Sequence, residues 1–61
     1  SPNVNPEVIS DTGFMTETLA KLYLSQKNYE KAIQSYKILS LKFPEKNGYF
    51  ADQIKKIKKL K

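Results

Sequence analysis

The chain contains no cysteine, no histidine and no arginine among its 61 residues. Without cysteine it can form neither a disulfide nor a thiolate–metal site, and without histidine it lacks the commonest general base and the commonest metal ligand. The sequence also has no Ser/His/Asp set, no glycine-rich phosphate loop and no metal-ligand cluster. We therefore expect neither an enzyme nor a bound cofactor or metal.

Long apolar runs are also missing, because no stretch approaches the roughly 18 residues needed to span a bilayer. The chain is long enough for only one small domain. A domain of this size buries about 60% of the surface that its unfolded chain exposes, so it is marginally stable alone. These features do not identify a compartment, which stays unknown with the cytoplasm slightly favoured.

The formal net charge is +5, and the excess is confined to one end of the chain. Five of its lysines lie close to the C-terminal end: Lys55, Lys56, Lys58, Lys59 and Lys61. Such a cluster can bind nucleic-acid phosphates or an anionic membrane. The absence of arginine removes two-pronged contacts to phosphate and guanine, and lysines also suit the C-terminal end of a helix. We expect a solvated face, with nucleic acid and membrane as less favoured partners.

Residues 1–12 are expected to form a flexible linker or arm. Two prolines exclude a regular helix there and favour extended backbone. The alternative is that Val8 and Ile9 cover part of the core. The Asp-Thr-Gly sequence at residues 11–13 signals a turn and a helix start with Thr12 as the N-cap.

Residues 13–61 are expected to form one all-α domain of three antiparallel helices, at about residues 14–26, 29–42 and 48–59. In each segment apolar side chains recur at the spacing of one helix face, and the alternation typical of strands is absent. These side chains are Met15, Leu19, Leu22 and Tyr23, then Tyr29, Ala32, Ile33, Tyr36, Leu39 and Phe43, then Phe50, Ala51, Ile54 and Ile57. Ile38 and Leu41 lie off the second stripe, which predicts that the second helix lies between two layers.

Seven residues in the first two segments have the spacing of a known repeat: Leu19, Ala20, Tyr23, Tyr29, Ala32, Tyr36 and Pro44. On these residues the chain resembles the tetratricopeptide repeat family, whose unit is a helix–turn–helix about 34 residues long. The resemblance covers a little under half of the chain. It implies that Ala20 and Ala32 permit a close helix crossing. It also implies that Tyr23 and Tyr36 fill the space between helices, and that the third helix is a polar cap.

The resemblance implies a function as well. A unit of this kind cannot bury its own apolar face, and it packs against a neighbour or holds a partner. We therefore expect a non-catalytic protein–protein interaction or assembly module, as the C-terminal part of a larger repeat protein. The alternative is a small basic adaptor that binds nucleic acid or an anionic surface through its lysine-rich last helix.

Two departures from the family pattern concern the turn and the end of the second helix. A glycine is usual where Lys27 stands, and we expect Asn28 to terminate the first helix in its place, because asparagine tolerates left-handed backbone. A leucine is usual where Lys42 stands. We therefore expect Leu41 and Phe43 to supply the missing apolar contact.

Peptide partners of this family usually lie in a groove lined by the first helix of each repeat. The resemblance places five residues of this chain on that face: Phe14, Glu17, Lys21, Leu24 and Ser25. We expect an apolar contact at Phe14 and Leu24, with rim charges from Glu17 and Lys21.

The first helix is also expected to have an uncovered apolar edge, made by Phe14, Met15, Leu22 and Leu24. Burying an apolar side chain of this size is worth roughly 1.5–3 kcal/mol. Two copies can cover such an edge through a two-fold contact, with the same patch on each. The sequence therefore predicts a homodimer of the isolated chain. The competing covers of this edge are the N-terminal arm, through Val8 and Ile9, and a preceding repeat in a longer protein.

Overall fold

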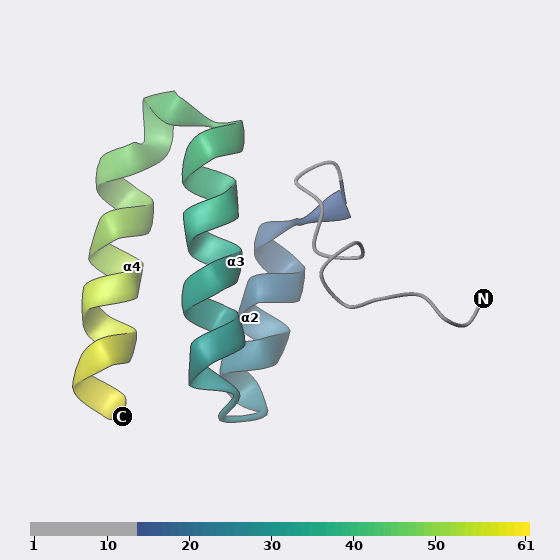
Figure 1. Ribbon diagram of the computed structural model, residues 1–61, viewed down its shortest axis with the longest axis vertical. Helices are drawn as coiled ribbons and strands as arrows, with labels where there is room; N and C mark the ends of the chain where they lie inside the picture. The colour runs from purple at the N-terminus through teal and green to yellow at the C-terminus, as the bar shows by residue number, and fades with distance from the viewer. Residues whose placement is uncertain (1–13) are drawn as a thin grey trace.

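Three α-helices make up most of the protein in the computed structural model, which describes residues 14–61 (Figure 1). They are α2 (Glu17–Ser25), α3 (Tyr29–Lys42) and α4 (Asn47–Leu60), and a short 3-10 helix, η2 (Pro44–Lys46), precedes α4. Successive helices run antiparallel, and residues 14–61 contain no strand. The predicted all-α class is confirmed. The expected arm at residues 1–12 lies outside the described residues.

Helix α2 begins later than the sequence predicted. Thr16, in extended conformation, is its N-cap, and its Oγ1 accepts a hydrogen bond of 3.1 Å from the backbone N–H of Leu19. The expectation that a helix starting near Phe14 would have Thr12 as its cap is therefore wrong. Threonine at either position can satisfy a free N–H, and the one actually used places Glu17 in the first turn, at the positive end of the helix dipole.

The turn between α2 and α3 also differs from the expectation. Lys27 adopts the left-handed conformation, with φ at 61°, and Asn28 does not. The Asn28 side chain instead accepts a hydrogen bond of 3.4 Å from the N–H of Lys31 and is the N-cap of α3. Asparagine suits both the left-handed position of a turn and the N-cap of a helix. Here Asn28 is the N-cap of α3, and the left-handed position falls at Lys27.

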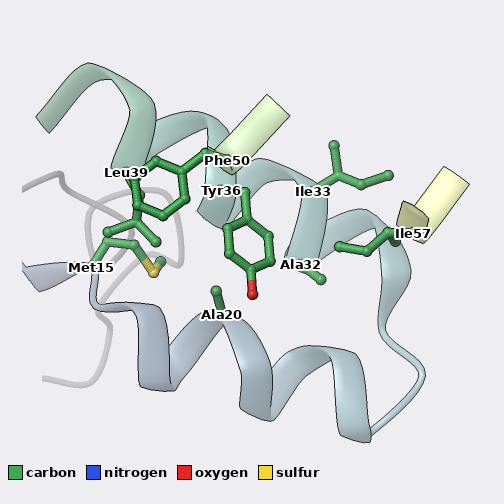
Figure 2. Packing of buried hydrophobic residues seen from close by; sticks show 8 residues of the cluster. All are labelled: Met15, Ala20, Ala32, Ile33, Tyr36, Leu39, Phe50 and Ile57. Carbon is green, nitrogen blue, oxygen red and sulfur yellow. The ribbon is translucent and has the colours of Figure 1, made fainter. Parts of the chain in front are cut away.

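Helix α3 is the central element and packs against both α2 and α4. Ala20 on α2 and Ala32 on α3 both belong to the core cluster, and both side chains are fully buried. A side chain no larger than a methyl group at each position leaves room for the helices to pack closely. Tyr36 is also buried, and Figure 2 shows its ring pointing from α3 toward α2. The prediction that α3 lies between two layers is confirmed.

Helix α4 covers the other side of α3. Phe50 and Ile57 are buried, Ile54 is half-buried against them, and the rings of Phe50 and Tyr36 lie 5.9 Å apart between centroids. Ala51, which the sequence placed on the same stripe, is exposed. The buried stripe is therefore narrower than expected, which leaves most of the α4 surface to polar residues.

The end of α3 is the third correction. Leu41 is 77% exposed and Phe43 is partly exposed, so neither replaces a missing core contact. Lys42 instead reaches back and donates a hydrogen bond of 3.0 Å from Nζ to the backbone carbonyl of Met15. The Met15 side chain is buried in the core cluster. A polar tether and a methionine thus close the region where an apolar contact was expected.

Candidate functional site

The predicted partner face on α2 is only partly available. Lys21 and Ser25 are exposed, and Phe14 is 71% exposed. Glu17 is half-buried, and Leu24 packs partly against the core. Leu24 therefore offers only part of its side chain to a partner, whereas most of Phe14 is open to the expected apolar contact.

The predicted apolar edge of the first helix is likewise smaller than expected. Met15 is buried and Leu24 is packed against the core, while Leu22 is 49% exposed and Phe14 is exposed. Two of the four expected residues thus present large apolar area to solvent. The apolar area available for a two-fold contact is correspondingly reduced.

Glu17 links α2 to α4. Its Oε2 accepts a hydrogen bond of 2.6 Å from the Tyr49 hydroxyl and lies 3.7 Å from Nζ of Lys21. The Tyr49 hydrogen bond, aided by the charges of Lys21 and Lys46, holds the pKa of Glu17 below its usual value, against the opposing effect of burial. The same hydrogen bond raises the pKa of Tyr49. The expected rim charge of Glu17 is therefore already engaged within the protein.

The lysine-rich end of α4 is exposed, as expected for a solvated face. All five lysines of this cluster are exposed: Lys55, Lys56, Lys58, Lys59 and Lys61. Lys56 lies 3.5 Å from Asp52, and Lys61 donates a hydrogen bond to Glu30 on α3. Within residues 14–61 no carboxylate lies within 4.0 Å of the other three. Their charges are the ones most available to an anionic partner.

A surface pocket of about 180 Å³ lies where the start of α2, the end of α3 and the start of α4 meet. Its walls are mainly apolar, and they include Met15, Leu39, Phe43 and Phe50. Thr16, Glu17, Lys42 and Lys46 complete the lining. The pocket thus joins an apolar floor to two ammonium groups and one carboxylate.

Sequence analysis did not predict this pocket. Its residues come from three helices and from η2, and no single helical stripe contains them. A usable signal was present, because Pro44 ends α3 and forces a short connection to the next helix. The side chains on both sides of such a connection must lie close together, and this places Lys42, Lys46 and Phe50 in one neighbourhood.

Residues 14–61 contain no group of three or more carboxylate, histidine or cysteine side chains that could hold a metal ion. None of the helices described is long and apolar enough to cross a bilayer.

Comparison with known proteins adds no relative to this description. No protein-family model matches the chain, and neither a curated protein nor a solved structure is detectably similar to it.

Proposed function

We propose that the chain is a tetratricopeptide-like helical module that holds a protein or peptide partner and catalyses no reaction. The observation that carries this proposal is the full burial of Ala20 on α2 and Ala32 on α3 within one core cluster. A fully buried small residue on each helix, together with a buried aromatic at Tyr36, is what closely packed repeat helices require. The module would be the C-terminal part of a larger array, with α4 as its polar cap.

The partner surface in this proposal is the exposed side of α2. Lys21 and Ser25 would supply polar contacts, and the uncovered edges of Phe14 and Leu24 would supply apolar ones. The Ser25 hydroxyl already donates a hydrogen bond of 2.8 Å to the carbonyl of Leu22, so it would act chiefly as an acceptor. Small contacts of this kind suit a partner that spans several stacked units.

Site-specific photo-cross-linking in cells tests this proposal. A photoreactive phenylalanine derivative replaces Ser25 on α2, and Gln34, an exposed residue on α3, is the matched control position. We expect a protein adduct from position 25 that is absent from position 34 and decreases when Lys21→Glu reverses the neighbouring charge. Equal adducts at both positions, or none at position 25, would contradict the proposal.

The second candidate is an anion-binding adaptor. It is favoured by the exposed lysines Lys55, Lys58 and Lys59, which have no carboxylate within 4.0 Å in residues 14–61. Binding of a single-stranded oligonucleotide through about five lysines should weaken about a hundredfold between 50 and 200 mM salt, because condensed counterions are released. Fluorescence anisotropy of a labelled oligonucleotide measures this slope. No binding at 50 mM salt would remove the candidate.

A further inference from the structure

We propose that the pocket between α2, α3 and α4 binds one large apolar side chain of a peptide, with an adjacent Asp or Glu carboxylate held by Lys42 and Lys46. This inference rests on the proposed function as an interaction module and names the partner chemistry of a second contact site. The site differs from the exposed side of α2 considered above.

The size of the pocket matches a single side chain. Its volume is about 180 Å³. A cavity of about 150 Å³ walled by leucine, isoleucine and phenylalanine is known to hold a molecule of benzene. The apolar wall here is of the same kind, since it combines Met15 and Leu39 with the rings of Phe43 and Phe50. A leucine or phenylalanine side chain would therefore fill the pocket, and alanine would leave most of it empty.

The charges at the pocket favour a carboxylate beside that side chain. Lys42 is held in place by its hydrogen bond to the Met15 carbonyl, and its Nζ lies 5.6 Å from the centre of the Phe43 ring. Lys46 lies on the same lining. Neither lysine has a carboxylate within 4.0 Å among residues 14–61. Both ammonium groups can therefore accept an acidic partner without breaking an ion pair.

The one carboxylate of the lining does not reverse this preference. Glu17 accepts a hydrogen bond from Tyr49, and the charges of Lys21 and Lys46 both act on its carboxylate. With Lys42 and Lys46 against Glu17, the lining keeps a net positive charge. The pocket also lies at the N-terminus of α2, where the helix dipole adds positive potential. A second copy of this chain is a poor occupant, because its lysine-rich end would bring like charge to the site. A nucleic acid would leave the apolar wall unfilled.

The test uses the full chain, labelled with ¹⁵N, and three blocked dipeptides followed by chemical-shift titration. Acetyl-Leu-Asp-amide presents the apolar group and the charge, acetyl-Leu-Asn-amide removes the charge, and acetyl-Ala-Asp-amide removes most of the apolar group. We expect Leu-Asp to shift the amides of Met15, Glu17 and Phe50, with a Kd in the millimolar range. Leu-Asn should bind at least about threefold more weakly and Ala-Asp about tenfold, the factor that 1.4 kcal/mol produces.

Protein variants locate the site. Lys42→Met keeps the aliphatic stem and removes the ammonium group, so it should weaken Leu-Asp about threefold and leave Leu-Asn unchanged. Lys37→Met, an exposed residue on the same helix, is the matched control and should change neither. Because Lys42→Met also removes the tether to Met15, a ¹⁵N spectrum with dispersed, unshifted core amides must accompany the measurement. The Lys46→Met variant removes the second ammonium group and leaves the hydrogen bond from Lys42 to Met15 in place.

Two outcomes would overturn this inference. The first is the absence of shifts at the pocket up to about 10 mM Leu-Asp, ten times a millimolar Kd. The second is an equal response to Leu-Asp and Ala-Asp centred on Lys55, Lys58 and Lys59, which would indicate unspecific attraction to the lysine-rich end. Cross-linking at position 25 reports on the proposed function separately. If that adduct forms and is unchanged by Lys42→Met while the peptide titration fails, only the pocket assignment is lost.

Discussion

The Tyr49 hydroxyl on α4 donates a hydrogen bond of 2.6 Å to the Glu17 carboxylate on α2. The two residues are far apart in sequence, and the hydrogen bond connects the two helices that pack on opposite sides of α3. It lies beside the pocket, to which Glu17 contributes. The Tyr49–Glu17 pair therefore both holds α2 and α4 together and positions one residue of the pocket lining.

The first prediction concerns the pH dependence of this pair. The pKa of Glu17 is lowered from 4.5, and the pKa of Tyr49 is raised from 10.0, chiefly by their shared hydrogen bond. A carboxyl with a lowered pKa stabilises the fold above its unfolded pKa, and this contribution is lost as the pH falls through the folded value. A phenol with a raised pKa stabilises it below pH 10, and the contribution is lost as the pH rises through the folded value.

Replacing Tyr49 by phenylalanine should therefore raise the pKa of Glu17 toward 4.5 and flatten the fall of Tm below about pH 4.5. The carboxyl ¹³C shift of Glu17 followed against pH measures the first effect, and thermal melts from pH 3 to 7 measure the second. Tyr29→Phe, on α3, is the control and should leave the Glu17 titration unchanged. An unaltered Glu17 pKa in Tyr49→Phe would show that the hydrogen bond contributes nothing in solution.

The second prediction concerns the helix crossing. Ala32→Leu places extra carbon atoms at a fully buried position of α3, so it should destabilise the protein by about 1–3 kcal/mol or more. Ala51→Leu makes the same chemical change at an exposed position of α4 and should alter stability by less than about 0.5 kcal/mol. Urea unfolding followed by circular dichroism measures both. Equal losses in the two variants would disprove a close crossing at Ala32.

The third prediction concerns the turn. Left-handed backbone costs a residue with a Cβ about 1–2 kcal/mol, whereas glycine adopts it freely and loses about 0.5–1 kcal/mol in chain entropy. Lys27→Gly should therefore stabilise the protein by about 0.5–1 kcal/mol. Lys37→Gly, in the middle of α3, should destabilise it by about 1 kcal/mol. Opposite signs in denaturant melts support the left-handed turn, and a loss in both variants would reject it.

The fourth prediction concerns self-association of the isolated chain. We propose that Phe14 and Leu22, both exposed, form a two-fold contact between copies, although Met15 and Leu24 do not contribute the area expected of them. Sedimentation at tens of micromolar should show a dimer in the original chain and a monomer in Leu22→Glu. Leu60→Glu, at an exposed leucine near the end of α4, should remain dimeric.

A monomer for the original chain would reject this contact. Leu24→Glu is a poor test of it, because Leu24 packs against the core and a charge there would destabilise the fold itself.

Periodicity alone was sufficient to predict three helices and the centre of their core. Ala32 and Tyr36 on α3, and Phe50 and Ile57 on α4, recur at helical spacing, and all four are buried. Each stripe indicates one helix with one buried face, so the number of helices follows from the sequence.

The details that sequence analysis missed are choices between locally equivalent residues. Thr12 and Thr16 can both cap a helix, and the left-handed position could fall at Lys27 or at Asn28. The hydrogen bond from Lys42 to Met15 and the neighbouring pocket form where three helices meet. The spacing of residues within one helix does not predict such a meeting. Such features become visible only when the elements are placed in space.

The three helices pack in series, with α3 in the middle, so they can open one at a time. Helix α3 packs against both α2 and α4. Helices α2 and α4 are linked to each other by the Tyr49–Glu17 hydrogen bond. Detachment of α4 alone would expose Phe50 and Ile57 and leave α2 packed against α3. Detachment of α3 would break its packing against both α2 and α4. Amide protons of α3 should accordingly exchange last with solvent, and those of α2 and α4 should report two separable openings.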